Sequence, residues 1–211
     1  MEMPGPDYPQ GRTALLLVDP YNDFLSEGGR FRTRLAEVAD AVDLLANLRR
    51  IRQAIRCARW PLVFVPHRRA ALTSLASGTP PPRAQATGPA ASAAHDWGGQ
   101  WHPDFTPGPG DIVAAEHRGA NGFVGTDLDL LLRQRRISHV VFAGVIANTC
   151  VETTARHAGE LDYHVTLVTD ATAAFSHDAM FYAHEINGPT YAHALLTTRE
   201  FLARVPFASA P

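Results

Sequence analysis

The sequence predicts an α/β domain in which helices cover both faces of a parallel sheet. Six short apolar runs alternate along the chain with longer amphipathic stretches, and this alternation is typical of right-handed strand–helix–strand units. The runs are nearly continuous in Val, Leu and Ile, as expected of strands that are buried on both faces. A chain of 211 residues is long enough for one such domain, and we expect residues 1–211 to form it.

The individual elements follow from the apolar runs and from helical spacing. The apolar runs predict strands at 13–21, 61–67, 111–117, 139–146, 164–171 and 193–198. In the stretch after the first strand, apolar side chains recur at helical spacing, at Leu35, Val38, Val42, Leu45, Leu48 and Ile55. Helices are therefore predicted at 35–58, 127–136, 150–160, about 178–187 and 199–204.

A long segment at 68–110 interrupts this regular order. It is crowded with Ala, Pro, Gly and Ser, although the aromatic residues within 95–105 are able to pack over a pocket. Loops of this length inside a domain are usually functional. We therefore expect 68–110 to be a covering loop and not a domain boundary.

Composition narrows the class of protein. A formal net charge of -2 and a pI near 6.5 argue against a nucleic-acid-binding protein, which usually carries excess positive charge. The apolar runs are shorter than the roughly 20 residues that a membrane span needs. The opening "MEMPGPDYPQGR" lacks the apolar core of a secretory signal, and two cysteines are too few for a disulfide framework. A cytoplasmic protein with free thiols is expected. All 19 basic residues are arginine, so the chain contains no lysine.

Polar side chains follow three of the predicted strands. Asp19 ends the first, Glu116 and His117 end the third, and Cys150 follows the fourth where a helix begins. In open parallel sheets, ligands bind outside the carboxyl ends of the strands. A carboxylate, a histidine or glutamate, and a thiol are therefore expected at one rim.

Cys150 has the features of an activated nucleophile. A thiol at a helix N-terminus lies near the positive end of the helix dipole, which favours the thiolate. Asn148 or Thr149 is expected to cap the helix, whose inner face is formed by Val151, Thr154, Ala155, Ala158 and Leu161. Asp19 is positioned to take the thiol proton and return it to a leaving group, while backbone N–H groups in the turn stabilise an oxyanion.

Each of these residues also has a structural interpretation. Free cysteines are among the most buried residues, so Cys150 is equally well interpreted as a small core residue by position alone. An aspartate after a strand is more often a turn former or helix cap than a catalyst, which applies to Asp19. Cys57, at the end of an arginine-rich helix, is expected to be structural.

Two segments and the spacing between them resemble the isochorismatase-like cysteine hydrolases. They are "TALLLVDPYNDF" and "NGFVGTDLDLLLRQRRISHVVFAGVIANTCVETTARHAGELDYHVTLVTDATAAF". That family includes nicotinamidases, carbamoylsarcosine amidases and ureidoacrylate amidases. The resemblance covers roughly residues 12–204, with 68–92 the least similar part.

The resemblance implies a three-layer α/β/α fold with a mainly parallel, Rossmann-like sheet of six strands. It implies Asp19 as general base and Cys150 as nucleophile, with a covalent acyl or carbamoyl enzyme that water hydrolyses. It also implies a cis peptide bond at Val145–Ile146 and an oxyanion hole formed by the N–H groups of Ile146 and Cys150.

The sequence departs from the family at the third catalytic residue. The family has a lysine near the end of the third strand, and this chain has none. Counting back from Phe123 places His117 at that position, whereas counting forward from Asp111 places Glu116 there. His117 is favoured because a histidine can supply a conditional positive charge and a glutamate cannot. Glu116 is the alternative.

The histidines do not match the metal site of the nicotinamidases. Those enzymes hold a divalent ion with an Asp-x-His pair after the second strand and another histidine. Here His67 lacks the aspartate, and His95, Asp96 and His102 have the wrong order and spacing. We predict no metal and no cofactor.

The resulting functional prediction is a metal-independent cysteine hydrolase that cleaves a C–N bond of a small amide or ureide. The apolar wall of its pocket is predicted from five aromatic residues: Tyr21, Phe24, Trp97, Trp101 and Phe123. Vinyl-ether hydrolysis of the isochorismatase type, and a non-catalytic binding or scaffold protein, are the alternatives. The expected partners are a small-molecule substrate and further copies of the chain in a dimer or tetramer, with no nucleic acid and no membrane.

Overall fold

Strand β1 (Thr13–Val18) lies at the centre of a six-stranded parallel sheet. The structure is a computed structural model that describes residues 7–67 and 96–206. The strand order is β3-β2-β1-β4-β5-β6, and every neighbouring pair is parallel. The other strands are β2 (Leu62–Val65), β3 (Ile112–Val113), β4 (His139–Val145), β5 (His164–Ala173) and β6 (Ala194–Leu196). The predicted parallel six-stranded α/β sheet is confirmed.

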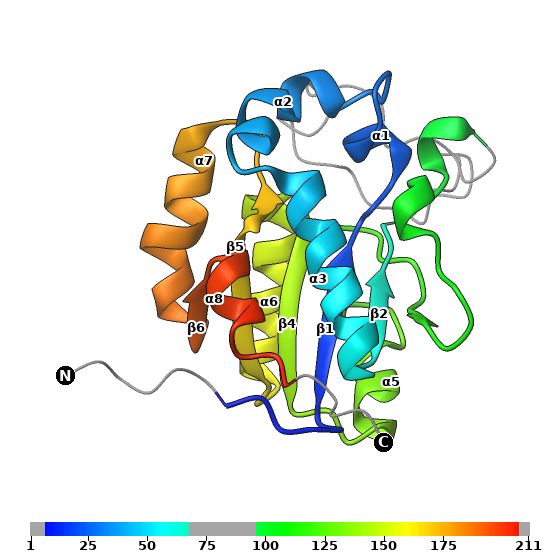
Figure 1. Cartoon of the computed structure of the whole chain (residues 1–211), viewed down its shortest axis with the longest axis vertical. Coiled ribbons are helices and arrows are strands. Elements are labelled where there is room, and N and C mark those ends of the chain that lie inside the picture. Colours follow the sequence, from blue (N-terminus) through cyan, green and yellow to red (C-terminus); the bar gives the residue numbers. More distant parts are fainter. Residues whose placement is uncertain (1–6, 68–95, 207–211) are drawn as a thin grey trace.

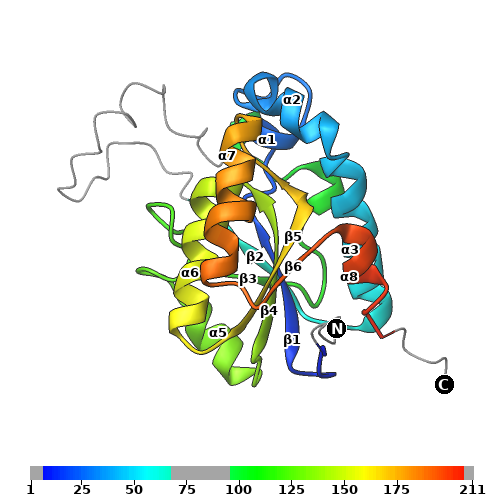
Figure 2. The same ribbon diagram turned by 90° about the vertical axis from the view of Figure 1, so that its left-hand side faces the viewer.

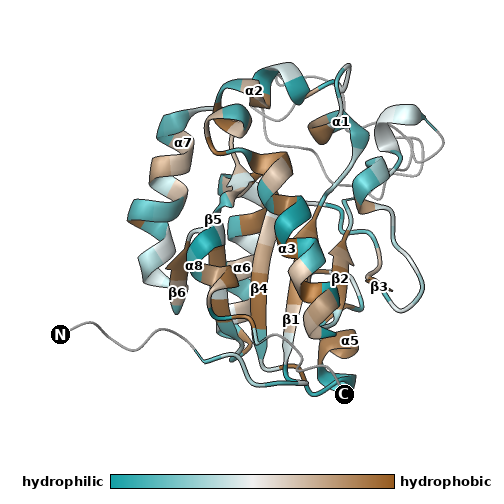
Figure 3. Cartoon of the chain, viewed as in Figure 1, coloured by the Kyte–Doolittle hydropathy of each residue, from teal (hydrophilic) through white to brown (hydrophobic). Residues whose placement is uncertain are grey.

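Helices lie on both faces of this sheet, as Figures 1 and 2 show. On one face pack α3 (Leu44–Ala58) and α8 (Thr198–Leu202), and on the other pack α5 (Leu128–Gln134) and α6 (Glu152–Glu160). Side chains of β1 alternate between the two cores, because successive residues of a strand point to opposite faces. The strands are accordingly the most apolar part of the chain in Figure 3.

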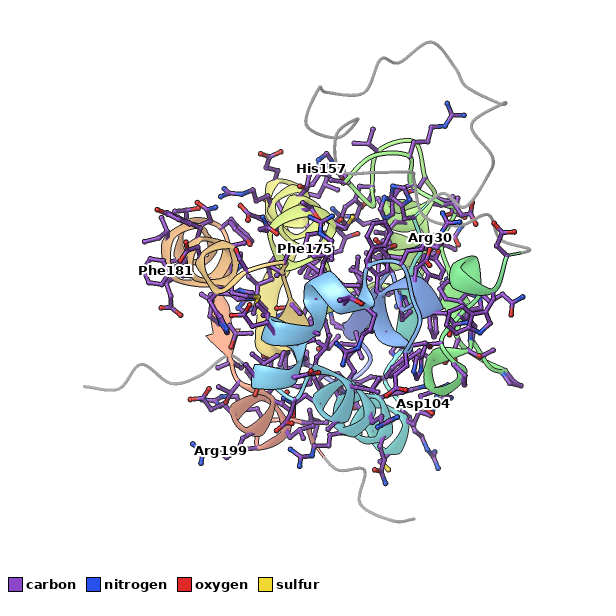
Figure 4. The ribbon with its side chains drawn as sticks, turned by 90° about the horizontal axis from the view of Figure 1, so that it is seen from above. Arg30, Asp104, His157, Phe175, Phe181 and Arg199 are labelled. Atoms are coloured by element: carbon purple, nitrogen blue, oxygen red, sulfur yellow. The ribbon has the colours of Figure 1, made fainter. Side chains whose placement is uncertain are left out.

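Shorter elements surround the carboxyl ends of the strands, the end seen in Figure 4. Helices α1 (Asn22–Leu25) and α2 (Arg32–Ala41) lie at this end. The remaining helices are α7 (His177–Phe181), the 3-10 turns η2 (Trp97–Gly99), η3 (Pro103–Phe105) and η6 (Gly188–Thr190), and the π-helical turns η4 (Ala147–Val151) and η5 (Tyr182–Asn187).

The predicted elements at 35–58 and 111–117 differ most from the structure in extent. The helix predicted over 35–58 is two helices, α2 and α3, because Asp43 adopts a left-handed conformation with φ of 52°. The Asn47 side chain stabilises this break by donating hydrogen bonds to the carbonyls of Val42 (2.8 Å) and Asp170 (3.0 Å). The strand predicted at 111–117 ends at Val113, after which the chain leaves the edge of the sheet.

The predicted covering loop lies outside the described residues over 68–95, and the remainder is fixed to the domain. Trp101 stacks on Tyr21, with ring centroids 4.9 Å apart. Farther along, Arg49 donates to Asp104 (2.7 Å) and Arg56 to Asp111 (2.7 Å), so two arginines of α3 hold the segment that leads into β3. Within the described ranges, no helix is both long and apolar enough to cross a membrane.

Gly144 in β4 allows β1 and β4 to approach closely at their carboxyl ends. It pairs with Val18 and has φ of 118°, and a Cβ at this position would lie 2.2 Å from the Val18 carbonyl oxygen. Any larger residue must therefore displace backbone and adopt a conformation that L-residues rarely adopt.

We expect Gly144→Ala to lower the free energy of unfolding by about 2–4 kcal/mol, because strain and overpacking add at one position. Gly159→Ala is the matched control, since its Cβ would make an ordinary 3.4 Å contact inside α6, where alanine is favoured over glycine by about 1 kcal/mol. Urea unfolding of both variants measures the difference. Equal stability of the two would contradict the close-approach argument.

Candidate active site

Asp19 follows β1 directly and turns toward the rim of the sheet. Its φ of 50° is left-handed, a conformation that aspartate tolerates better than most residues. Its backbone N–H donates to the Val65 carbonyl (3.2 Å), and its Oδ1 accepts a 2.6 Å hydrogen bond from the N–H of His67. The carboxylate is buried, with 1% of the residue exposed, so these contacts fix its position within the protein.

His117 lies beside Asp19 although β3 ends four residues earlier. Its N–H donates to the Pro66 carbonyl (2.9 Å), which extends the pairing of β2 and β3 by an isolated bridge between His67 and His117. Its Nδ1 is 2.6 Å from the Gly119 carbonyl oxygen, and its Nε2 is 3.6 Å from Oδ1 of Asp19. The imidazole is fully buried.

The Gly119 contact determines which nitrogen of His117 carries a proton. A carbonyl oxygen accepts hydrogen bonds only, so Nδ1 is the donor and Nε2 faces the carboxylate. Burial by itself lowers the pKa of His117. The Asp19 carboxylate, the Gly119 carbonyl and the charge of Glu116 outweigh burial and raise this pKa above its ordinary value.

Cys150 lies in the π-helical turn η4 between β4 and α6. The backbone N–H groups of Thr149 and Val151 both donate to the Ile146 carbonyl (3.1 and 3.2 Å), which closes this turn. The peptide bond Val145–Ile146 that precedes it is cis. Val151, Thr154, Ala155 and Ala158 are buried as predicted, so the segment after Cys150 is anchored against the sheet.

These three residues form one group, which we call the Asp–His–Cys cluster (Asp19, His117 and Cys150). One side-chain donor atom from each lies within 4.8 Å of the other two. Asp19 and His117 are buried, whereas Cys150 is partly exposed. Three segments that are far apart in the sequence thus meet at the carboxyl edge, beside the point where the strand order reverses between β1 and β4.

Glu116 does not belong to this cluster. It is partly exposed, and its charge acts on His117 from one residue away. Of the two positions considered for the third residue, the structure places His117 next to Asp19.

The surroundings of Cys150 oppose the thiolate that its place near a helix N-terminus is expected to favour. Burial, and then the negative charge of Asp19, raise the pKa of this thiol well above its ordinary value. The Thr149 side chain and the Ile146 backbone act in the opposite direction but do not outweigh them. The predicted cap is wrong: Asn148 is exposed, and the Thr149 hydroxyl donates back to the Ile146 carbonyl (3.4 Å).

The five aromatic residues predicted for the pocket have different surroundings. Tyr21 and Phe24 are buried; the Tyr21 hydroxyl donates to the His67 carbonyl (3.2 Å), which connects it to the segment beside Asp19. Trp101 covers Tyr21, while Trp97 is 51% exposed. Phe123 packs in the core on the opposite face, against His157 and Tyr163.

The other residues considered for metal or structural roles lie elsewhere. His102 accepts a hydrogen bond from the Asp104 N–H (3.1 Å) and caps the turn η3, and burial lowers its pKa. Asp96 is exposed and His95 lies outside the described residues. Cys57 is exposed near the end of α3 and lies outside the Asp–His–Cys cluster.

Sequence reasoning missed the backbone groups that hold the cluster. They are the Gly119 carbonyl, which accepts from His117, and the His67 N–H, which donates to Asp19. Backbone groups carry no residue-type signal, so only the fold reveals them.

A parallel α/β sheet with a thiol, a carboxylate and a nitrogen base at its carboxyl edge is typical of cysteine hydrolases. The chain belongs to the isochorismatase family: the model of the isochorismatase domain matches residues 13–199. It is a hydrolase of that family.

Individual relatives agree with this assignment. The chain is 30% identical to ureidoacrylate amidohydrolase RutB of Variovorax paradoxus over 202 residues, which cover 90% of this chain and 80% of the relative. It is 30% identical to RutB of Pseudomonas syringae pv. syringae, over 77% of this chain and 71% of the relative.

Solved structures show the same fold. A cysteine hydrolase from Pseudomonas syringae pv. phaseolicola superposes with a TM-score of 0.81 at 23% identity, covering 97% of this chain and 98% of the other. N-carbamoylsarcosine amidase from Thermoplasma acidophilum has a TM-score of 0.69 at 27% identity, covering 90% and 98%.

The raised pKa of Cys150 predicts slow alkylation at neutral pH. In a Cys57→Ser background, the iodoacetamide rate should still be rising at pH 9, because only the thiolate reacts. Asp19→Asn should move the rise to lower pH, since it removes the neighbouring negative charge. Chelator in all samples excludes metal effects. A rate that is already constant at pH 7 would contradict the protonated thiol.

Proposed function

We propose that the chain is a cysteine hydrolase that cleaves the C–N bond of a small amide or ureide through a covalent intermediate on Cys150. The observation that carries this proposal is the Asp–His–Cys cluster, with its donor atoms within 4.8 Å of one another at the carboxyl edge of the sheet. The relatives support the same class, because ureidoacrylate amidohydrolase and N-carbamoylsarcosine amidase are both amidohydrolases by name.

The first step requires a base, because the thiol of the free enzyme is protonated. Asp19 takes the proton from Cys150 as the sulfur attacks the carbonyl carbon of the substrate. Proton transfer and attack are coupled in this way, so a stable thiolate is not needed. The buried position of Asp19 fixes its carboxylate near the sulfur and away from solvent.

The negative charge on the substrate oxygen then needs hydrogen-bond donors. The N–H groups of Ile146 and Cys150 are the proposed donors. Ile146 directly precedes the π-helical turn η4, and Cys150 lies within it. As the C–N bond breaks, Asp19 returns its proton to the leaving nitrogen. A thioester or thiocarbamate remains on Cys150. Asp19 next takes a proton from water, whose oxygen attacks the carbonyl carbon; as the C–S bond breaks, Asp19 returns this proton to the Cys150 sulfur, which restores the thiol and the carboxylate.

His117 is proposed as a positioning residue that acts through Asp19. Its Nδ1–H donates to the Gly119 carbonyl, so its Nε2 faces the Asp19 carboxylate at 3.6 Å and, when the ring is protonated, orients this base by the attraction of opposite charges. It supplies in this way a positive charge in a chain that has no lysine.

The nucleophile is tested by Cys150→Ala. Hydrolysis of an amide and ureide panel, with ureidoacrylate and N-carbamoylsarcosine included, should fall to background, because a methyl group cannot attack. The thermal unfolding midpoint should stay close to that of the parent. Cys57→Ala is the control and should keep its activity, since that thiol is exposed on α3. Turnover by Cys150→Ala would contradict covalent catalysis by Cys150 and would favour vinyl-ether hydrolysis with Asp19 as the acid catalyst.

The base is tested by Asp19→Asn, which keeps the shape of the side chain and its hydrogen bond from His67. Acylation should slow by about 10²–10⁴-fold, the usual contribution of general acid–base catalysis. Single-turnover measurement of covalent adduct formation checks this step. An Asp19→Asn enzyme as fast as the parent would reduce Asp19 to a turn residue.

The third position is tested by comparing His117→Lys, His117→Ala and Glu116→Gln. His117→Lys should be more active than His117→Ala and should extend the pH profile of kcat/KM to higher pH. Its ammonium keeps its charge up to a reference pKa near 10.4, whereas the imidazolium loses its charge once pH exceeds its raised pKa. If Glu116→Gln is inactive and both His117 variants match the parent, the positioning residue is Glu116.

A further inference from the structure

The Asp–His–Cys cluster has a second chemical property that its role in hydrolysis does not use. An imidazole nitrogen, a carboxylate oxygen and a sulfur point at one another, and together they are a common ligand set for Zn2+. Within the described part of the chain, this is the group of three such side chains whose donor atoms lie this close.

The distances fit a single small cation. Zn2+ binds sulfur at about 2.3 Å and nitrogen or oxygen at about 2.0–2.2 Å, so two ligands of a tetrahedral site lie about 3.3–3.6 Å apart. Nε2 of His117 and Oδ1 of Asp19 are 3.6 Å apart, too far for a direct hydrogen bond and suitable for two ligands of one ion. The sulfur lies within 4.8 Å of both, so a small side-chain movement completes three ligands.

The buried nitrogen of His117 is the observation that points to a cation. Because Nδ1 carries the proton, the neutral ring presents a lone pair at Nε2 to a carboxylate oxygen, which is also an acceptor. Nε2 is fully buried and has no hydrogen-bond partner. Two acceptors face each other stably only when a proton or a metal ion lies between them. Protonation and metal binding are therefore two alternative states of the same site.

The groups behind the ligands are arranged as in metal sites. Metal-binding histidines usually donate their other N–H to a carbonyl or carboxylate, which fixes the ring and its tautomer. The Gly119 carbonyl accepts the Nδ1–H of His117 and fixes its ring, and the N–H of His67 donates to Oδ1 of Asp19 and fixes its carboxylate. Both contacts come from the backbone, so they hold the two ligands in place whether or not an ion is bound.

The local charge and access also favour a cation. The charges that act on His117 are those of Asp19 and Glu116, both negative, and the chain has no lysine whose ammonium could occupy the cluster. Cys150 is partly exposed, which gives an ion a route from solvent. Three protein ligands leave a fourth position open, as in catalytic zinc sites.

We infer that Asp19, His117 and Cys150 bind one thiophilic divalent cation, Zn2+ or Co2+, in place of the proton that they otherwise hold. Binding forms a bond between the metal and the Cys150 sulfur, and the thiol proton is released to solvent. Soft thiolate and imidazole ligands select against Mg2+ and Ca2+. Metal binding and covalent catalysis then exclude each other, because the ion holds both the Cys150 sulfur and the Asp19 carboxylate that acts as the base; this inhibition rests on the proposed function, whereas the site itself does not.

The site is tested by titrating the chelator-treated full chain with Co2+ and then displacing Co2+ with Zn2+. We expect one ion per chain and a thiolate-to-Co2+ charge-transfer band in the near ultraviolet, which reports sulfur ligation independently of activity. Cys150→Ser should abolish this band. His117→Lys should weaken affinity by more than about 100-fold, since even loss of a contact behind a ligand weakens binding about 10–100-fold.

The controls are a second thiol and a second histidine. Cys57→Ser and His177→Gln change exposed residues on α3 and α7, and both should bind Co2+ like the parent. Asp19→Asn provides another ligand variant if His117→Lys does not fold, as judged by circular dichroism. Absence of the charge-transfer band in the parent, or unchanged affinity in the ligand variants, overturns the inference.

Activity assays separate this inference from the proposed function. An amidase that works in chelator and is inhibited reversibly by stoichiometric Zn2+ supports both. Activity in chelator without metal binding overturns the metal site alone. Metal binding by a chain that hydrolyses nothing in chelator supports the site and overturns metal-free cysteine catalysis. In the His117→Lys enzyme, any remaining activity should resist Zn2+, because a ligand has been replaced by a cation.

Discussion

The parallel pairing of β1 with β4 is the constraint on which the site depends. Val18 lies opposite Gly144, and the missing side chain at Gly144 lets the two backbones approach at the rim. Asp19 is the next residue on one strand, and Cys150 follows the other strand within one π-helical turn. The carboxylate and the sulfur meet because these two strands end side by side, at the place where the chain moves from one half of the sheet to the other.

The imidazole of His117 reaches the same edge from β2 and β3, through backbone pairing beyond the end of β3. β3 is only two residues long, yet one further backbone bridge from His67 to His117 carries the chain back to the rim. The same residue, His67, donates its N–H to Asp19. The end of β2 thus fixes two members of the cluster at once, and it does so with backbone groups that do not depend on the identity of the side chain.

The electrostatics of this edge depend on the buried carboxylate of Asp19 and on its two titratable neighbours, Cys150 and His117. Asp19 raises the pKa of both Cys150 and His117. The protonated form that a raised pKa favours is neutral for a thiol and positively charged for an imidazole. The raised pKa favours the neutral thiol at Cys150 and the protonated imidazole at His117. A cluster with a neutral thiol, a carboxylate and an imidazolium suits proton transfer during attack, and loss of two protons from it leaves three ligands for a metal ion.

Sequence patterns alone predict the class of the fold and place Asp19 and Cys150 at one edge of the sheet. Continuous apolar runs require strands covered on both faces, and their alternation with helices requires a parallel sheet, so Asp19 and Cys150 were bound to reach the same edge. Tertiary structure decided what local patterns cannot. The break at Asp43 depends on Asn47 reaching the Asp170 carbonyl, 123 residues away. The placement of His117, and not of Glu116, next to Asp19 depends on backbone contacts from Pro66 and Gly119. The pKa of the Cys150 thiol is raised by burial and by Asp19, which outweigh the effect of a helix N-terminus because that end carries only about half an elementary charge.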